Sequence, residues 1–249
     1  MEQSVFRGGA YSLCLKSFNP PMDRDHWVNG LEDKPGRFCH RSTYLELPPA
    51  WLGQRFLADA EHLKRVNRPL YDQEYLGIPV GDGERVFPNL RLEAFDRSRL
   101  GRVVSGVDWG WWPDPWAFVR IAYDGQTRTL FVLDEDRGNR LGNLESGRRV
   151  LARIGDNEPV LADSAEPKSI ADYRRLGICC RAVAKGRGSV AYGYKWLQSL
   201  SAIVIDPVRC PETAREFRAC VYDNGALPGK DDHQIDAVRY ASSAFWRQN

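Results

Sequence analysis

The chain has 249 residues, of which 43% are hydrophobic and 27% charged, a composition typical of globular proteins. Its formal net charge of +2 gives no overall basic field, so a surface that binds nucleic acid has to be a local patch. No segment approaches the roughly 18 apolar residues that a membrane span needs, and no basic segment followed by an apolar region opens the chain. We therefore expect a soluble intracellular protein without a membrane partner. Its six cysteines show no C-x-x-C spacing and predict reduced, mostly buried thiols.

The first hundred residues show no regular alternation of strands and helices. Apolar periodicity predicts a helix from about Trp51 to Val66, whose apolar stripe includes Phe56, Ala60 and Leu63. A shorter helix is expected around residues 70–76, ended by a glycine. Residues 81–99 are expected to form a linker, because glycine and proline recur there.

The pattern changes to strands near residue 103. Three apolar segments separated by turn signals, at residues 103–109, 116–123 and 129–133, predict an antiparallel meander. Strands and helices then alternate, which implies parallel pairing. The expected elements are a helix at 144–154, a strand at 160–162, a helix at 167–176, a strand at 179–183, a helix at 190–200, a strand at 202–205 and helices at 212–221 and 232–246. This order predicts an α/β protein with a ribonuclease H-like mixed sheet flanked by helices.

Three aspartates stand in positions that suggest chemistry. Asp108 and Asp163 end predicted strands, and Asp236 lies on the last predicted helix. A carboxylate at the end of a buried strand is costly unless it caps a helix or binds a cation. The first two strands are expected to be neighbours, so all three carboxylates can meet at one end of the sheet. Such a site would hold two divalent ions about 4 Å apart, which is the chemistry of phosphodiester cleavage.

Each aspartate also has a purely structural interpretation. Asp108 precedes Trp109-Gly110 and could be a turn residue, whereas Asp163 could cap the helix that follows it. Asp236 could form an ion pair with Arg239, three residues further along the same helix. The combination of the three favours the metal site over these separate explanations.

A basic segment between residues 181 and 195 predicts a surface that binds DNA phosphates. Two glycines in it would let the backbone approach a phosphate, although a solvated loop is the alternative. The basic side chains are Arg181, Lys185, Arg187 and Lys195.

Aromatic and acidic residues near the predicted strands have a more ordinary interpretation. Trp109, Trp111, Trp112 and Trp116 could stack on unpaired bases, but we expect them to belong to the core. Glu135 could approach the metals, although a solvated strand end is the favoured interpretation.

The sequence resembles the large terminase subunit of tailed phages, the motor-nuclease that packages DNA, and in particular its C-terminal nuclease domain. The motifs that carry the resemblance follow in the family's order: Gly106-Val107-Asp108-Trp109-Gly110 with Asp114-Pro115, Ala162-Asp163-Ser164-Ala165-Glu166-Pro167-Lys168, Lys185-Gly186-Arg187-Gly188-Ser189, and Asp232-His233 through Asp236-Ala237-Val238-Arg239-Tyr240. The resemblance implies that Asp108, Asp163 and Asp236 bind Mg²⁺ or Mn²⁺, with Asp232 and His233 as auxiliary ligands. It also implies double-stranded DNA as substrate, the ATPase domain, the small terminase subunit and the portal as partners, and the cytoplasm of a bacterial host as location.

The first hundred residues resemble the end of the family's ATPase domain. The motifs there are Phe18-Asn19-Pro20-Pro21, His26-Trp27-Val28-Asn29, Ser42-Thr43-Tyr44-Leu45 and Glu74-Tyr75-Leu76-Gly77. The expected organisation is a remnant of the ATPase domain at 1–85, a linker at 86–101 and the nuclease domain at 102–249. A G-x-x-x-x-G-K-[ST] loop does not occur in these residues, so we expect no ATP site and no ATP hydrolysis. The chain is expected to be a fragment that begins inside the ATPase domain, or the product of a split or truncated gene.

The favoured hypothesis is a two-metal endonuclease that cuts concatemeric double-stranded DNA with low sequence specificity. One alternative is a non-catalytic module for DNA binding and docking in the packaging motor. Another is a different ribonuclease H-like nuclease, such as a junction resolvase.

Overall fold

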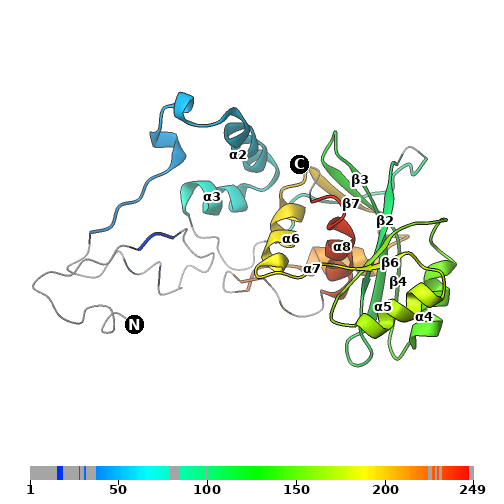
Figure 1. The fold of residues 1–249 in the computed structure, drawn as a ribbon. Coiled ribbons are helices and arrows are strands. Elements are labelled where there is room, and N and C mark those ends of the chain that lie inside the picture. Colours follow the sequence, from blue (N-terminus) through cyan, green and yellow to red (C-terminus); the bar gives the residue numbers. More distant parts are fainter. Residues whose placement is uncertain are drawn as a thin grey trace, which may run out of the picture.

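The computed structural model describes residues 16–18, 28, 31, 38–78, 85–98, 100–223, 226–227, 229 and 232–246. A seven-stranded sheet with the order β1-β7-β4-β3-β2-β5-β6 forms the centre of this part (Figure 1). The strands are β1 Leu90–Leu92, β2 Val103–Asp108, β3 Trp116–Asp124, β4 Thr129–Gly138, β5 Val160–Ala162, β6 Cys180–Ala182 and β7 Ala202–Ile205. The helices are α2 Gln54–Val66, α3 Arg68–Leu76, α4 Asn143–Leu151, α5 Pro167–Arg175, α6 Ser189–Gln198, α7 Pro211–Ala219 and α8 His233–Ser242.

The strand pairing confirms the predicted fold class. Strands β2, β3 and β4 form an antiparallel meander, after which β5 pairs in parallel with β2 and β6 with β5. Strand β7 returns to the other side of the meander and pairs in parallel with β4. The sheet is thus mixed, and β2 and β5, the strands that precede Asp108 and Asp163, are neighbours as expected.

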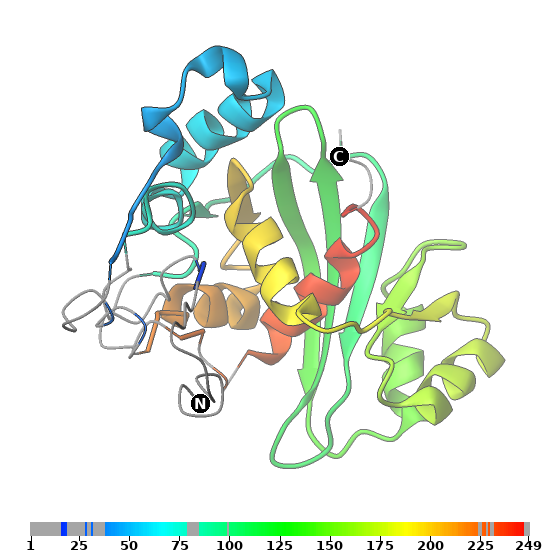
Figure 2. The same ribbon diagram turned by 60° about the vertical axis from the view of Figure 1, so that its left-hand side comes forward.

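Helices cover both faces of this sheet. One face carries α6, α7 and α8, and the other carries α4 and α5 (Figures 1 and 2). The first face forms the larger core, in which Ile121 and Ile203 of the sheet pack with Leu197 of α6 and Phe217 of α7. On the second face Phe118 packs in a separate cluster with residues of α4 and α5. The alternating side chains of the central strands therefore serve two cores.

The segment expected to be a linker belongs in part to the sheet. Leu90–Leu92 forms the edge strand β1, parallel to β7, and Val86 and Phe87 are buried in the larger core. A three-residue strand is too short to leave a period-2 pattern, which explains why the sequence did not indicate it. The predicted domain boundaries at residues 85 and 101 remain predictions.

Strand β4 is longer than predicted, because it continues to Gly138 through a run of charged residues. These residues stay paired with β3, and several of their charges are compensated. Arg153 lies 3.3 Å from Asp136, for example, and Arg137 lies 2.8 Å from Glu216. Compensation of this kind makes an apolar pattern unnecessary at the end of the strand.

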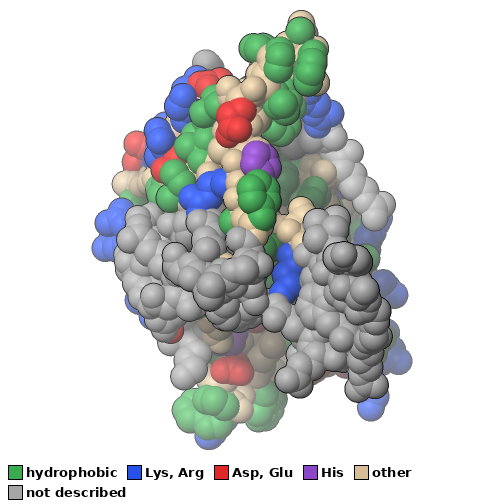
Figure 3. All heavy atoms as spheres, turned by 90° about the vertical axis from the view of Figure 1, so that its left-hand side faces the viewer, with side chains coloured by type: hydrophobic (Ala, Val, Ile, Leu, Met, Phe, Trp, Pro, Cys, Tyr) green, Lys and Arg blue, Asp and Glu red, His purple; other side chains and the backbone are tan. Residues whose placement is uncertain are grey.

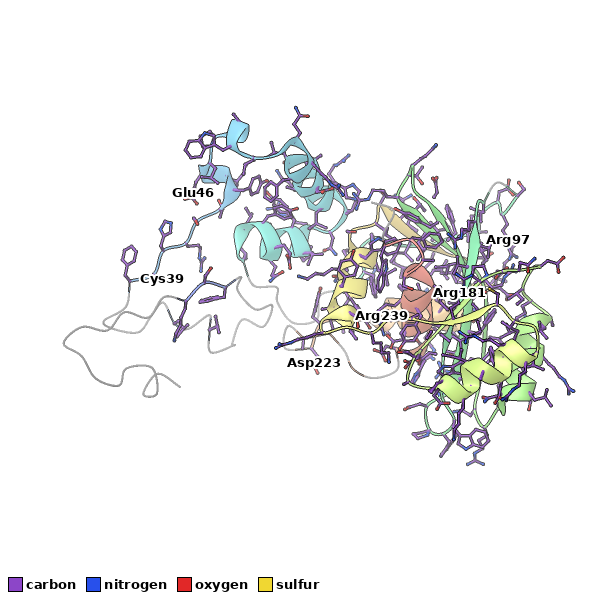
Figure 4. All side chains as sticks on the ribbon, in the orientation of Figure 1. Cys39, Glu46, Arg97, Arg181, Asp223 and Arg239 are labelled. Carbon is purple, nitrogen blue, oxygen red and sulfur yellow. The ribbon has the colours of Figure 1, made fainter. Side chains whose placement is uncertain are left out.

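Helices α2 and α3 form a separate helical pair beside α6 (Figures 1 and 2). Asn67 caps α3 by accepting a hydrogen bond from the Leu70 amide, and Gly77 ends it in the left-handed conformation at φ 66°. The pair's own core is small and consists of Ala60, Leu63, Leu70 and Tyr71. Cys39 and Glu46, labelled in Figure 4, lie on its far side from the sheet.

The apolar stripe predicted for the first helix is only half buried. Ala60 and Leu63 face the small core, but Trp51 is 76% exposed and lies in a preceding 3-10 turn, and Phe56 is 40% exposed. Hydrophobic side chains accordingly gather at the top of the face in Figure 3, over this part of the chain. The motifs expected at residues 19–27 lie outside the described residues. Within the described ranges, no helix combines the length and the apolar character needed to cross a membrane.

Candidate functional site

The structure brings the three predicted aspartates to one end of the sheet. Asp108 ends β2, and Asp163 directly follows β5, where its amide donates a hydrogen bond to Val107 of the neighbouring strand at 3.2 Å. Asp236 is on α8, which packs across β2 and β3. The three elements that were expected to supply the site therefore do meet.

The spacing between β2 and α8 is set by their backbones. Gly106 lies against α8 so closely that a Cβ atom there would overlap the carbonyl oxygen of Ala237. Asp108 is two residues beyond this contact on the strand, and Asp236 is one residue before it on the helix. Glycine is required at position 106 because any side chain would push the helix off the sheet.

Asp108 is the buried member of the three aspartates. It is 8% exposed, and burial raises its pKa to about 6. The hydrogen bond with His233 lowers this pKa, whereas the negative charges of Asp236 and Asp163 raise it further. A carboxylate in this setting is short of positive charge at neutral pH, and a bound cation would stabilise it.

The other two aspartates have basic partners. Lys185 Nζ lies 2.5 Å from Asp163 Oδ1, and Arg239 donates to both carboxylate oxygens of Asp236 at 3.0 and 2.8 Å. The ion pair considered as the structural interpretation of Asp236 is thus present. Asp163 does not cap the next helix, whose N-cap residue is Glu166, but accepts a hydrogen bond from the Ala165 amide in the connecting turn.

His233 joins two carboxylates. Its Nδ1 lies 3.2 Å from Asp108 Oδ2, and its Nε2 lies 3.6 Å from Asp114 Oδ1. The hydrogen bond with Asp108 raises the pKa of His233, so the protonated imidazolium is favoured between the two negative charges. Asp232, the other predicted auxiliary ligand, turns towards α6 and accepts a hydrogen bond from the Tyr194 hydroxyl at 3.3 Å.

The donor set suits hard divalent ions, although its present arrangement is not a finished metal centre. Three carboxylates supply the oxygen ligands that Mg²⁺ and Mn²⁺ prefer. Within the described part of the chain, however, no group of three or more His, Cys, Asp or Glu side chains is placed so that it could hold an ion. Lys185 and Arg239 supply positive charge beside Asp163 and Asp236 instead, and His233 adds to it beside Asp108 when its ring is protonated. The assignment of Asp108, Asp163 and Asp236 as metal ligands remains a prediction.

The predicted DNA-binding residues lie in three different settings. Lys185 lies at the site, but Lys195 points to the helical pair and forms an ion pair with Glu74 of α3. Arg181 lies on β6, where it is exposed (Figure 4), and Arg187 is exposed in the segment before α6. The structure therefore places only Lys185 directly against an aspartate of the site.

Sequence reasoning missed the residue that holds the start of α8. Glu216 of α7 is 3% exposed and accepts hydrogen bonds from the backbone amides of Gln234 at 2.7 Å and Ile235 at 3.4 Å. Arg137 donates to its other oxygen at 2.8 Å, and burial raises the pKa of Glu216 to about 7. These partners are 18 and more residues away in the sequence, so no local pattern indicated the contact.

Glu135, considered above as a neighbour of the metals, has a different role. Its carboxylate accepts hydrogen bonds from the amides of Glu212 and Thr213 at 2.9 and 2.7 Å, at the first turn of α7. Glu135 thus anchors α7 to β4, and Glu216 in turn anchors α8 to α7.

The tryptophan prediction holds for two of four residues. Trp116 is buried in a core, and Trp109 donates from its indole nitrogen to the Asp163 carbonyl at 2.9 Å while packing edge-on against Tyr173. For Trp111 and Trp112 the prediction is wrong, because they are 59% and 62% exposed.

Comparison with known proteins finds large terminase subunits among the relatives of this chain. No family model matches the chain. The large terminase subunit of Bacillus phage SPP1 is 36% identical over an alignment of 264 positions, gaps included, which covers 97% of this chain and 62% of that protein. The chain therefore spans less than two thirds of this relative's length.

Solved structures agree with this result. The crystal structure of the g2p large terminase nuclease domain from bacteriophage SPP1, with bound Mn, has a TM-score of 0.58 and 36% identity, over 63% of this chain and 96% of that chain. The large terminase of a thermophilic bacteriophage, in complex with ADP, has a TM-score of 0.65 over 91% of this chain and 60% of that chain. Its identity of 17% supports a shared fold alone.

Proposed function

The chain belongs to the terminase large-subunit family, and from this premise we propose that its sheet region is a metal-dependent endonuclease that cuts double-stranded DNA during packaging. The observation that carries the proposal is the meeting of Asp108, Asp163 and Asp236 at one end of β2, β5 and α8. Low sequence specificity is expected, because the sequence contains no recognition-helix or zinc-finger motif for reading bases.

By their chemistry, Asp108, Asp163 and Asp236 would suit a centre of two Mg²⁺ or Mn²⁺ ions, because hard divalent ions prefer carboxylate oxygens. When bound, such ions activate a water and stabilise the departing oxygen of a phosphodiester. His233 would hold the Asp108 carboxylate in position, as it does here at 3.2 Å. Manganese bound to the SPP1 nuclease domain supports an ion of this class.

Lys185 and Arg239 are expected to contribute through their charge. Each neutralises an aspartate of the site, which keeps a cluster of carboxylates stable in the absence of a cation. If a cation took the place of Lys185 at Asp163, the Lys185 ammonium would be free to contact a DNA phosphate, which is the role predicted for this segment.

The wider biology is proposed on the family alone. It comprises work with an ATPase domain, a small terminase subunit and a portal in the cytoplasm of a bacterial host. Concatemeric DNA would be the substrate in that setting.

Plasmid nicking in Mn²⁺ or Mg²⁺ tests the nuclease assignment. Asp108→Asn should lower the nicking rate at least about 100-fold, since it removes a carboxylate from the reacting centre. Asp206→Asn is the matched control, because Asp206 also follows a buried strand and is 5% exposed, yet its carboxylate serves a local turn, where it accepts the Val208 amide and lies 3.5 Å from Arg209 Nε. Equal nicking by wild type and Asp108→Asn would overturn the assignment.

A non-catalytic DNA-binding module is the second candidate, favoured by the basic partners that already occupy Asp163 and Asp236. Retardation of DNA without cleavage at any metal concentration would support it. A preference for four-way junctions over linear duplex would instead indicate a resolvase-like activity on the same fold.

A further inference from the structure

The connection between β2 and β3 is fixed at both ends beside the site. It leaves the site at Asp108, which lies 3.2 Å from His233 Nδ1, and returns at Asp114, which lies 3.6 Å from His233 Nε2. One imidazole therefore contacts both ends of the loop. Residues 109–113 lie between these two anchored ends and are therefore held beside the site.

The tip of this loop is apolar and exposed. Trp111 and Trp112 are 59% and 62% exposed, whereas Trp109 and Trp116 on either side of them are packed into the protein. Exposed loop tips usually carry small or polar residues, because adjacent exposed indoles favour association and aggregation. Two adjacent exposed tryptophans are thus unusual at the tip of a loop.

The tip is also held in place. The Arg140 amide donates to the Trp111 carbonyl at 2.8 Å, and the Asn139 side chain donates to the Pro113 carbonyl at 3.0 Å. The Arg140 guanidinium lies 4.7 Å from the centre of the Trp112 ring. Arg140 itself has a φ of 57°, a left-handed conformation that a non-glycine residue rarely adopts without a compensating contact. Two indoles are therefore presented to solvent by a fixed backbone.

The chemistry of this surface matches nucleic acid. Indole faces stack on unpaired or unstacked bases, and an adjacent guanidinium can reach a phosphate or a base plane. We propose that Trp111 and Trp112, here called the tryptophan ledge, contact the DNA bases next to the phosphate that is cut at the aspartates. The inference rests on the proposed nuclease function and adds to it a contact with bases, separate from the phosphate contacts expected of Lys185.

The binding of a fluorescein-labelled DNA duplex with a short single-stranded gap tests the ledge. Anisotropy is measured in EDTA, so cleavage does not enter the result. The double variant Trp111→Ala/Trp112→Ala should bind about tenfold or more weakly, the effect of losing base–aromatic stacking. Trp51→Ala is the matched control, since Trp51 is 76% exposed but lies before α2, and its affinity should equal that of wild type.

Salt dependence separates stacking from charge. The slope of log affinity against log salt should stay unchanged in the double tryptophan variant, because no ion contact is removed. In Arg187→Met, which removes an exposed charge of the predicted DNA-binding segment, the slope should become shallower by about one, the value for one lost phosphate contact. Trp111→Phe/Trp112→Phe should restore most of the affinity, which shows that ring stacking matters and that the loop remains folded.

The outcomes distinguish this inference from the nuclease proposal. If wild type neither binds nor nicks DNA, the proposed function fails and the ledge fails with it. If wild type nicks plasmid but the double alanine variant binds gapped duplex as wild type does, only the ledge is overturned. Unchanged DNA affinity together with loss of self-association in sedimentation would show that the surface contacts protein instead.

Discussion

The helical pair α2–α3 and the sheet region use the same kinds of polar contact at very different depths. The pair is joined to the sheet region by Lys195–Glu74, His62–Ser199 and Arg128–Asp59, contacts whose side chains are largely half-exposed or exposed. Inside the sheet region, Arg120–Glu158 and Arg137–Glu216 involve glutamates whose side chains alone are 6% and 1% exposed.

This difference in burial indicates which contacts hold the aspartates in place. Exposed ion pairs contribute little to stability, because water competes for both partners and both side chains must be ordered. Buried pairs are costly to break, since one partner is left charged without compensation. We therefore expect the sheet region to hold the aspartates by itself and the helical pair to be a weakly attached unit.

Truncating a core leucine in each region tests this separation most strongly. Leu197→Ala should lower the free energy of unfolding by about 2–5 kcal/mol, because Leu197 is fully buried in the larger core. Leu70→Ala, in the small core of the pair, should unfold α2 and α3 and leave nicking unchanged. Urea titration followed by circular dichroism, with proteolysis to report on each region, measures both. If both variants unfolded in a single transition and were destabilised to the same extent, the two regions would not be separate folding units.

Removing the carboxylate of Glu216 tests how the buried contacts hold the site. Glu216→Ala leaves the Gln234 amide and the Arg137 guanidinium without this acceptor, so we expect about 1–3 kcal/mol lower stability and slower nicking. Glu216→Gln retains an oxygen for the amide and should lose less of both. Plasmid nicking and thermal unfolding of the two variants provide the comparison, and equal behaviour of Ala and Gln would show that the hydrogen bond to α8 is unimportant.

The ion pair between the two regions should matter far less. Glu74→Gln removes the partner of Lys195, whose side chain is 52% exposed, and should change stability by less than about 1 kcal/mol. High salt should abolish even this difference by screening. Unfolding in low and high salt measures the effect. A loss of stability comparable to that of Glu216→Ala would show that the Lys195–Glu74 ion pair is as important as the buried contacts.

The smallest effect concerns pH. His62 Nε2 lies 2.7 Å from the Ser199 carbonyl, and burial lowers the pKa of His62 below its usual 6.5. Packing of the helical pair against α6 thus favours the neutral His62 ring. The stabilisation that this contact contributes is fully present above pH 6.5 and is lost as the pH falls from 6.5 towards the lowered pKa. Hydrogen exchange of α2 should accelerate over this range, whereas that of α4 should not. His62→Gln should remove the dependence.

The sequence predicted an antiparallel meander followed by parallel strands, because the central strands carry apolar runs and the segments between the later strands contain recognisable helices. It also located the three aspartates, since they follow or accompany such elements. It could not indicate β1, which has only three residues, or the contacts of Glu216 and Glu135, whose partners lie on other elements. The exposure of Trp111 and Trp112 was missed for a related reason, because tryptophan composition predicts burial and the anchoring of the loop by Arg140 is a tertiary contact.

The contact of Gly106 with Ala237 has a consequence for how such a site can change over time. The distance between Asp108 and Asp236 is fixed by two main chains in contact, which no ordinary side-chain substitution in the surrounding core alters. Core residues can therefore be exchanged for others of similar volume at a cost in stability alone. Gly106→Ala would instead force α8 away from β2, so that one added methyl group would change the spacing of the two aspartates and lower stability together.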